Sequence, residues 1–409
     1  MKKTMTLTVS ISHIMDYINS KGVVRLKDFQ EPAGNLDTTT NMPSQHEKKK
    51  APLVTVGVLT TANKRGLPGG EGIRIFKEMV AYGNKYNVAV FFFFPRDVNW
   101  KRKKIAGLIW NGKIWRKKIL PFPDIVYNRI RFRNIESQEH VKRLLRQFEK
   151  EPSIHLFNSR FLNKWEVYKA LMENDDTAYW LPETVPLSRQ SLAAMLRKYP
   201  EVFLKCSYGS LGKGIIKINR LNKGQYVYAV ANKGAVVWKK SNSIDALYRQ
   251  LYVLTRNAYL VQRGIDLACY KGRVFDLRTQ YQKNGRGEWV LTGVAVRVAG
   301  KNRFVTHIPN GGFAASFEKV MNEAFPGDSK VINKIYEQLE QIRKLPPVLE
   351  EKLNLSLAVL SMDIGVDKTG RIWVIEVNSK PAKFDEIEIR NTHWQYLMEY
   401  FIYLAQKTN

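Results

Sequence analysis

The most informative segment of the chain lies near its C-terminus and reads Ser361-Met-Asp-Ile-Gly-Val-Asp-Lys-Thr-Gly-Arg-Ile-Trp-Val-Ile-Glu-Val-Asn-Ser-Lys-Pro381. Apolar residues alternate on both sides of Asp367-Lys-Thr-Gly370, which predicts a β-hairpin. A turn centred on the last two of these residues places Asp363 opposite Glu376, and Asn378 shares a strand face with Glu376. Directly opposed like charges repel. The pattern therefore predicts either a hard cation such as Mg²⁺ between these oxygens or an ordinary exposed hairpin with a polar face.

The composition indicates a globular chain with more than one domain. At 409 residues the chain is too long for one small core, and 44% hydrophobic residues exclude a disordered protein. No apolar run approaches the roughly 20 residues of a membrane span, and the N-terminus lacks the apolar core of a secretory signal. Two cysteines, Cys206 and Cys269, cannot make a disulfide framework or a zinc cluster. A cytoplasmic location is therefore expected.

The net charge is strongly positive and unevenly distributed. The chain carries 66 Lys and Arg against 37 Asp and Glu, and residues 51–155 alone hold 21 basic against 8 acidic side chains. The densest basic runs are Lys101–Lys104, Arg116–Lys118 and Arg129–Arg133. Such a field attracts polyanions, including nucleic acid, anionic polymer or a phosphorylated substrate. It equally suits a solubilising surface, so charge makes an acidic partner plausible without identifying one.

The first part of the chain is predicted to contain an extension and a basic α/β domain. Residues 1–50 form the N-terminal extension, which ends in a linker rich in Pro, Thr and Lys. Residues 53–59 and 88–94 are apolar on both faces, as in buried parallel strands, and enclose a helical pattern at 71–86. After this start of an α/β sheet, the sequence predicts a basic hairpin at 100–120 with Asn111-Gly112 at its turn, a strand at 123–130 and a charged helix at 137–150.

A second unit begins near Phe157 and mixes helices with strands. Its helices are predicted at 163–173, at 188–199 with Ser188 as N-cap, at 329–353 and at 392–406. Its strands are predicted at 202–205, 215–219, 259–263, 275–283 and 289–298, the last two as an antiparallel pair.

A glycine-rich loop, Lys205-Cys-Ser-Tyr-Gly-Ser-Leu-Gly-Lys-Gly214, joins two of these strands. It is not a Walker A loop, because Gly214 follows Gly212-Lys213 where Ser or Thr is required. It is not a dinucleotide fingerprint, because a strand follows it and not a helix. Such a hairpin can fold its backbone N–H groups over phosphates, with Lys205 supplying charge, or it can be a flexible surface hairpin.

The order of the motifs resembles that of the ATP-grasp superfamily. In sequence these are Lys205, the glycine-rich hairpin, Val261-Gln-Arg-Gly-Ile265, Asp276-Leu-Arg278, Arg297, Asn310-Gly-Gly312, Asp363 and Glu376-x-Asn378. Over residues 52–409 the chain resembles, more closely, YheC/YheD-type endospore coat-associated ATP-grasp proteins. The likeness includes Pro123-Asp-Ile-Val-Tyr-Asn-Arg129, Leu181-Pro-Glu-Thr184 and Phe275-Asp-Leu-Arg278.

The resemblance implies an α/β (α+β) protein with an ATP-grasp fold and an N-terminal α/β pre-ATP-grasp domain. The expected boundaries are 1–50 for the extension and linker, 51–156 for the basic domain and 157–409 for the ATP-grasp domain. Within the last, residues 157–265 would form the central subdomain with the glycine-rich hairpin, and residues 266–409 the C-terminal subdomain with the metal site.

The resemblance also assigns roles to individual residues. It implies phosphate contacts from Lys164 and Lys205; a cover over the triphosphate from Gly209, Ser210, Gly212 and Gly214; an adenine hinge at Gln262, Arg263, Gly264 and Ile265; a ribose contact from Asp266; catalysis by Arg278 and Arg297; and Mg²⁺ ligation by Asp363, Glu376 and Asn378. Each residue also has a simpler interpretation. Lys164 could begin an exposed helix, Arg278 could be a structural ion-pair partner, and Arg297 could face solvent.

The function implied by the resemblance is ATP- and Mg²⁺-dependent ligation of a carboxylate to an amine or a thiol through an acyl-phosphate. The family also implies association with the endospore coat, in the mother cell or spore coat of a sporulating bacterium. The alternative is a non-catalytic coat component, or a polyanion-binding protein, that keeps the fold. The expected partners are ATP, unknown carboxylate and amine substrates, and anionic polymer or coat components. The sequence contains no helix-turn-helix, zinc or RNA-binding motif that would indicate specific nucleic-acid binding.

Overall fold

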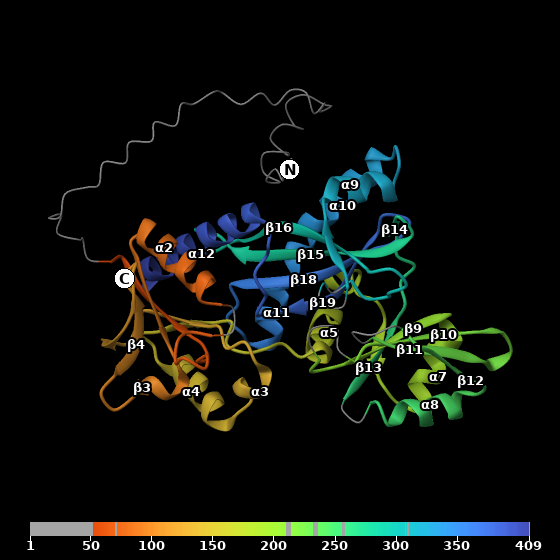
Figure 1. Ribbon diagram of the computed structural model, residues 1–409, viewed down its shortest axis with the longest axis horizontal. Helices are drawn as coiled ribbons and strands as arrows, with labels where there is room; N and C mark the ends of the chain where they lie inside the picture. The colour runs from red at the N-terminus through yellow and green to blue at the C-terminus, as the bar shows by residue number, and fades with distance from the viewer. Residues whose placement is uncertain are drawn as a thin grey trace.

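The computed structural model describes residues 52–69, 72–209, 214–231, 236–255, 258–306, 308 and 311–408, and in these residues three β-sheets are covered by helices (Figure 1). The extension predicted for residues 1–50 lies outside the described residues, as do Ser210 and Gly212 of the glycine-rich loop. None of the helices in the described part of the chain is long and apolar enough to span a membrane.

The first sheet has the strand order β3-β4-β2-β1-β6-β7, with β5 paired to β4. Its elements are β1 (Val54–Leu59), α2 (Ile73–Lys85), β2 (Val88–Phe93), η1 (Pro95–Asp97), β3 (Val98–Asn99), β4 (Lys104–Trp110), β5 (Trp115–Pro121), β6 (Ile125–Asn128), α3 (Arg133–Glu136), α4 (Glu139–Lys150) and β7 (His155–Phe157). Strands β2, β1, β6 and β7 are parallel, which agrees with apolar runs buried on both faces. The predicted basic hairpin is β4–β5, whose last pair, Trp110 with Trp115, leaves a loop two residues longer than predicted.

The first sheet is doubly wound, because helices pack on both of its faces. On one face, Phe76 and Met79 of α2 pack with Val56 of β1. On the other, Leu144 and Phe148 of α4 belong to a separate core. Since α2 follows β1 and α4 follows β6, the chain leaves these neighbouring strands toward opposite faces. The junction between β1 and β6 is therefore a topological switch point.

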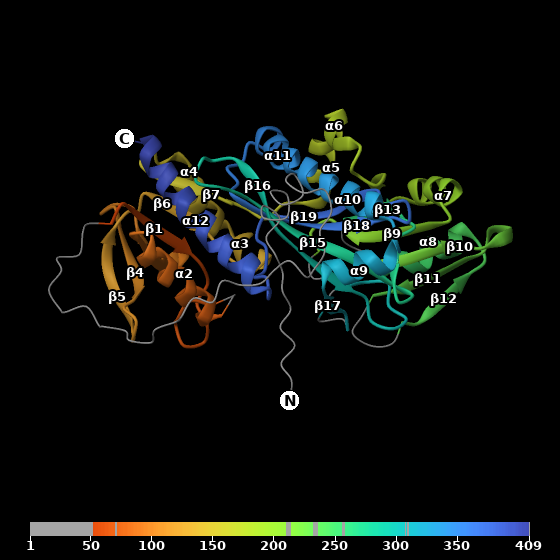
Figure 2. The ribbon, with the colours of Figure 1, turned by 90° about the horizontal axis from the view of Figure 1, so that it is seen from above.

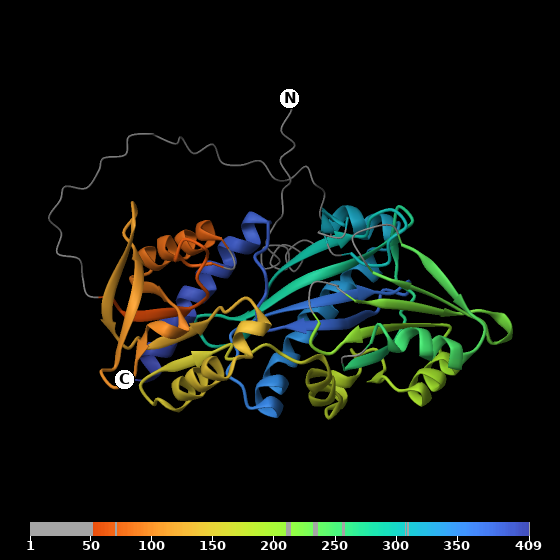
Figure 3. The same ribbon diagram turned by 60° about the horizontal axis from the view of Figure 1, so that its bottom comes forward.

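The central sheet is largely antiparallel, in the order β12-β11-β10-β9-β13-β8. Its elements are β8 (Thr184–Pro186), α7 (Arg189–Lys198), β9 (Glu201–Cys206), β10 (Ile216–Arg220), η2 (Asn222–Gly224), β11 (Tyr226–Val230), β12 (Trp238–Ser241), α8 (Ile244–Tyr252) and β13 (Tyr259–Arg263). The Ser188 side chain caps α7 as predicted, accepting a hydrogen bond from Ser191 N–H. Helices α7 and α8 pack on one face of the sheet, and its other face turns toward the third sheet (Figure 3).

The third sheet has the order β17-β16-β15-β18-β19, with β14 paired to β15. Its strands are β14 (Cys269–Tyr270), β15 (Arg273–Lys283), β16 (Trp289–Val298), β17 (Phe313–Ala315), β18 (Val359–Val366) and β19 (Ile372–Asn378). The helices around it are α5 (Lys164–Met172), α6 (Asp175–Ala178), α9 (Phe317–Ala324), α10 (Ser329–Gln341), η4 (Ile342–Lys344) and α11 (Leu345–Leu353). Side chains of α5, α10 and α11 share one large core with strands β15, β16, β18 and β19.

The β18–β19 hairpin confirms the predicted pairing of Asp363 with Glu376, although the register near its turn differs from the predicted one. Its turn is closed by a hydrogen bond from Gly370 N–H to Asp367 O, with Gly370 at φ 77°, where glycine is favoured. Near this turn, pairing is offset by one residue from the predicted register. A β-bulge between Asp363 and Ile364 corrects the offset and brings the two carboxylates opposite one another.

The C-terminal helix α12 (Ile387–Thr408) returns to the first sheet. Its residues Trp394, Leu397 and Phe401 share a core with α2, β1 and β2. Figure 2 shows α12 lying beside α2, between the first and third sheets. The two ends of the described chain therefore form one packed layer, and the last helix fixes the first sheet relative to the third.

A buried asparagine, Asn158, reinforces this junction. It directly follows β7, has a left-handed backbone (φ 52°) and is completely buried. Its Nδ2 donates to Val359 O (2.7 Å) and Ser379 O (2.5 Å), and its Oδ1 accepts from Ala358 N–H (3.0 Å). One side chain thus satisfies backbone groups of both strands of the β18–β19 hairpin from the first sheet.

We predict that Asn158→Ala lowers the free energy of unfolding by about 3 kcal/mol or more, because it leaves several buried backbone groups without partners. Asn302→Ala is the matched control, since Asn302 is also left-handed (φ 58°) but exposed. It should cost only the backbone term of about 1 kcal/mol. Urea unfolding of both variants measures the difference, and equal losses would contradict this role for Asn158.

Candidate functional site

A pocket lies between the central and third sheets, and both polar and apolar side chains line it. Polar side chains come from α5, β8, β9, β13 and β19, namely Lys164, Thr184, Lys205, Gln262 and Glu376. The apolar lining comes from Val167, Tyr168, Leu181, Pro182, Leu260, Val374, Ile375 and Val377. A ligand with an apolar part and an anionic part would match such a lining.

Lys205 is buried on β9 and held in one orientation. Alternation along β9 sends Leu204 into the core beneath α7 and α8 and turns Lys205 to the pocket. The Lys205 ammonium donates a hydrogen bond to Gln262 Oε1, and Gln262 Nε2 donates to Thr184 Oγ1 (3.1 Å). Burial lowers the pKa of Lys205 to about 8, although the nearby Glu376 carboxylate opposes this shift. The amine is therefore desolvated and already aimed into the pocket.

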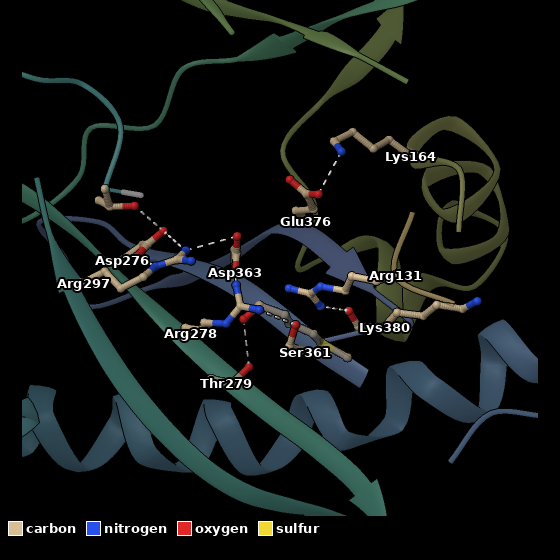
Figure 4. A network of polar contacts seen from close by, with 12 residues as sticks. Arg131, Lys164, Asp276, Arg278, Thr279, Arg297, Ser361, Asp363, Glu376 and Lys380 are labelled. Carbon is tan, nitrogen blue, oxygen red and sulfur yellow. Dashed lines mark hydrogen bonds and ion pairs between the residues drawn. The ribbon is translucent and has the colours of Figure 1, made fainter. Parts of the chain in front are cut away.

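Lys164 begins α5 but does not face solvent. Asn163 caps the helix, accepting from Trp165 N–H and Glu166 N–H. The Lys164 ammonium donates to Glu376 Oε1 (2.8 Å), as Figure 4 shows. It also donates to Gly209 O (2.7 Å). This side chain therefore ties the start of the glycine-rich loop to the β18–β19 hairpin.

The second carboxylate of the hairpin, Asp363, lies between two arginines. Arg297 Nη2 is 3.1 Å from Asp363 Oδ2, and the same guanidinium binds Asp276 through Nε (2.9 Å) and Nη2 (2.5 Å). Arg278 makes only long contacts, 3.4 Å to Asp363 Oδ1 and 3.4 Å to Ser361 Oγ. Burial alone would raise the pKa of Asp363, but Arg297 and Arg278 lower it below its ordinary value. Asp363 is therefore ionised, Arg297 is committed to two carboxylates, and Arg278 is the more available cation.

The oxygen donors of the hairpin do not form a preassembled metal cage. Within the described residues, no group of three His, Cys, Asp or Glu side chains could hold a metal ion. Asp363 and Glu376 contact cations, while no described protein group hydrogen-bonds the Asn378 amide, which lies on the Glu376 face of β19. This all-oxygen set suits Mg²⁺, which uses one or two carboxylates and completes its shell with water and substrate phosphates.

The four predicted hinge residues have different positions relative to the pocket. Gln262 lines it, but Arg263 N–H donates to Glu183 O (2.8 Å) and Gly264 N–H to Glu201 O (2.9 Å). The Arg263 guanidinium lies over Tyr199 and Trp373, 5.1 and 5.0 Å from their ring centres. Asp266 is exposed and pairs with Lys368 (2.8 Å). Ile265 does not line the pocket, and Gly214 O accepts from Tyr259 OH (3.1 Å).

The sequence did not predict the apolar lining of the pocket or the ion pair between Asp276 and Arg297. Tyr168 lies one helical turn after Lys164 on α5, a spacing that places both on one helix face. Leu181 and Pro182 belong to a segment already noted for its family likeness. Asp276 stands two residues before Arg278 on β15, and its partner Thr306 donates from the loop after β16 (2.7 Å).

Comparison with known proteins establishes the class. The model of the YheC/D-like ATP-grasp family matches residues 153–404, more than half of the chain. The chain belongs to this family and has an ATP-grasp fold. It is 28% identical to the endospore coat-associated protein YheD of Bacillus subtilis (strain 168) over 320 residues, covering 75% of this chain and 68% of that protein. It is 23% identical to YheC of the same strain over 312 residues, covering 75% and 84%.

Solved structures with a similar fold include two ligases. One is the D-Ala:D-Ser ligase VanG from Enterococcus faecalis, with 11% identity, coverage of 86% of this chain and 99% of that chain, and a TM-score of 0.46. Another is D-alanyl-alanine synthetase A from Vibrio cholerae O1 biovar eltor str. N16961, with 13% identity, coverage of 87% and 98%, and a TM-score of 0.48.

We predict that Lys205→Met stabilises the ligand-free protein at pH 7. Burial lowers the pKa of Lys205 from 10.5 to about 8, a cost of about 3 kcal/mol, and losing the hydrogen bond to Gln262 offsets part of the gain. We expect a net gain of about 1–2 kcal/mol. Between pH 8 and 10.5 the unfolded chain binds a proton that the folded wild type lacks, so wild-type stability rises and the difference shrinks.

Urea unfolding of wild type and variant at pH 7 and pH 9.5 tests this prediction. Lys217→Met is the control, because Lys217 lies on the adjacent strand β10 but pairs with Glu201 (2.7 Å). That variant should be no more stable than the wild type at pH 7. A Lys205→Met protein that is less stable than the wild type at pH 7 would refute the assignment of a costly buried charge.

Proposed function

We propose that the protein binds ATP with Mg²⁺ in this pocket and uses it to activate a carboxylate, which an amine or a thiol then attacks. The observation that carries the proposal is that Lys164 and Lys205 line the pocket together with apolar side chains, while Arg278 and Arg297 bind Asp363, the carboxylate opposite Glu376. The apolar lining fits the nucleobase, and the cations fit the phosphates. Membership in the ATP-grasp family supports the same assignment.

In this proposal the residues have distinct tasks. Lys164 and Lys205 bind phosphate oxygens, and the glycine-rich loop covers them. Asp363, Glu376 and Asn378 would hold Mg²⁺, which when bound neutralises phosphate charge. Gln262 keeps Lys205 oriented, and among the four predicted hinge residues it is the one that lines the pocket. The roles predicted for Arg263, Gly264, Ile265 and Asp266 rest on the family resemblance.

The proposed chemistry needs charge neutralisation and positioning more than a reactive side chain. An oxygen of the substrate carboxylate bonds to the γ-phosphorus while the bond from that phosphorus to the ADP oxygen breaks. The amine or thiol then bonds to the acyl carbon, phosphate leaves with its electron pair, and the proton of the nucleophile passes to solvent. Arg278 contacts the transferring group, whereas Arg297 positions Asp363 and is itself held by Asp276.

A second candidate function is a non-catalytic coat component that keeps the fold and binds polyanions. The observation in its favour is the net charge of +29, which a ligase for small neutral molecules does not require. The curated relatives YheD and YheC are described as endospore coat-associated, which suits either candidate and suggests the mother cell or spore coat as the location.

We predict that ATP with Mg²⁺ raises the thermal unfolding midpoint of the wild type. At a ligand concentration one hundred times the Kd, the stabilisation should reach about 2.7 kcal/mol. Glu376→Ala should abolish it, because this carboxylate holds Lys164 and is a proposed Mg²⁺ ligand. Glu288→Ala removes an equal charge from an exposed pair with Arg286 and should keep the full shift. A wild type that ATP with Mg²⁺ does not stabilise would refute nucleotide binding.

We further predict carboxylate-dependent release of ADP, and a loss of about a hundredfold or more in its rate on Arg278→Ala, because one donor to the developing charge is removed. The variant should still be stabilised by ATP with Mg²⁺. Arg286→Ala, which removes an exposed arginine, should keep wild-type turnover. If ATP binds but no carboxylate in a broad panel elicits ADP release, the structural candidate replaces the ligase.

A further inference from the structure

Strand β5 is the outer edge of the first sheet and is exposed along nearly its whole length. Among the described residues it pairs with β4 alone, and every position except Trp115 and Leu120 is exposed. Figure 2 shows it at the end of the molecule away from the central sheet. An edge strand directs a row of N–H and C=O groups away from its sheet, where another strand can pair with them. β5 therefore offers an open backbone edge seven residues long.

One face of β5 carries cations that have no partner within the described chain. Arg116 and Lys118 lie two residues apart and so share a face, with about 7 Å between them along the strand. Neither makes an ion pair or a side-chain hydrogen bond with another described residue. Their cross-strand neighbours on β4 are Ile109 and Gly107, which cannot neutralise a charge. The two cations are therefore free to bind a carboxylate from another molecule.

Further cations lie at both ends of the strand. Lys113 lies in the loop before β5, and Lys104 of β4 pairs with Pro121, the last residue of β5. Both lysines are exposed and have no carboxylate partner among the described residues. Lys117, on the other face of β5, differs because it pairs with Asp97 (2.9 Å). Cations without a partner thus occur along the whole open edge.

The charge of this edge selects among the strands that could pair with it. Charged side chains on an edge strand hinder pairing with a copy of itself. If two copies of β5 paired antiparallel about Lys117, Arg116 of each copy would oppose Lys118 of the other, and opposed like charges are destabilising. An extended peptide with carboxylates at alternate positions repeats them at the same spacing of about 7 Å, so each would oppose a cation. The edge thus disfavours a second copy of this chain and favours an acidic segment.

We infer that β5 is a docking edge for an extended acidic segment of another protein, which adds to the first sheet as a further strand. Backbone hydrogen bonds to β5 hold the segment, and its alternate carboxylates pair with Arg116 and Lys118. The edge lies apart from the proposed nucleotide pocket, whose lining includes no residue of the first sheet. The inference therefore stands whether or not the protein is a ligase.

Fluorescence anisotropy on the full chain tests the inference with a labelled peptide as long as β5, in which Glu alternates with Thr. A peptide with Gln in place of Glu removes the charge. A peptide N-methylated at every residue keeps the carboxylates but donates no backbone N–H. The inference predicts that the first peptide binds and that the other two bind about tenfold more weakly or less. Equal binding of the acidic and the N-methylated peptide, or no binding of the acidic peptide, would overturn it.

Charge reversal locates the binding edge. Arg116→Glu combined with Lys118→Glu should raise the Kd of the acidic peptide about tenfold or more at low salt, because two attractions become repulsions. The matched control is Lys239→Glu combined with Lys240→Glu, which reverses two exposed cations on β12, the edge strand of the central sheet. The control should keep the Kd within about twofold. An equal or larger rise in the control would overturn the assignment to β5.

Amide hydrogen exchange distinguishes an added strand from a general attraction of polyanions. The acidic peptide should slow exchange in β5, because outward N–H groups become hydrogen-bonded, and should leave β12 unchanged. Inorganic polyphosphate carries negative charge without a peptide backbone, so it should compete weakly and leave β5 exchange unchanged. If polyphosphate displaces the peptide at an equal concentration of charge, or if the peptide does not protect β5, the docking edge is refuted.

Discussion

The site depends on burying ionised side chains between two sheets while keeping each of them close to an opposite charge. Cross-strand pairing sets Arg278 against Asp363, and Asp363 in turn against Glu376. The second of these pairs opposes two like charges, which is unfavourable unless other groups compensate. Arg297 from β16 reaches Asp363, and Lys164 from α5 reaches Glu376. An uncompensated buried charge costs several kcal/mol, so the hairpin is stable only because these two elements supply cations.

This arrangement suggests how a ligand can enter without leaving charges unpaired. In the free protein the hairpin carboxylates are neutralised by Lys164, Arg278 and Arg297. In the proposed complex, phosphate oxygens would bind Lys164 and Arg278. Mg²⁺ would then replace these two cations beside Asp363 and Glu376. Each ionised group keeps an opposite charge in both states. The cations already lie beside these carboxylates in the free protein, so they need not be brought in from solvent when the ligand binds.

The sequence predicted local features of the site well, because they depend on strand alternation and turn chemistry. The pairing of Asp363 with Glu376 followed from a two-residue period and a turn, although a bulge contributes to the register. The apolar lining of the pocket was not predicted. Sequence periodicity indicates that Tyr168 shares a helix face with Lys164, but it does not indicate which strands lie opposite that face. The packing of α12 on the first sheet was missed for the same reason. The backbone partners of the predicted hinge, such as Glu183 and Glu201, could not be predicted because they come from distant segments.

The basic character of residues 51–155 acquires a more specific meaning from the fold. As a property of composition, it favoured a coat component that binds polyanions. Part of that charge, however, lies at the carboxyl edge of the first sheet, where Arg131 contacts the segment that leaves β19. Charge on the exposed strand β5 acts over the surface and is screened by salt, whereas the partly buried guanidinium groups at the switch point are screened less. The two basic regions therefore need not share one purpose. Arg129 and Arg131 bind the backbone that leaves β19 and so support the junction between the sheets, whereas the exposed charge is free to serve attachment to an anionic environment.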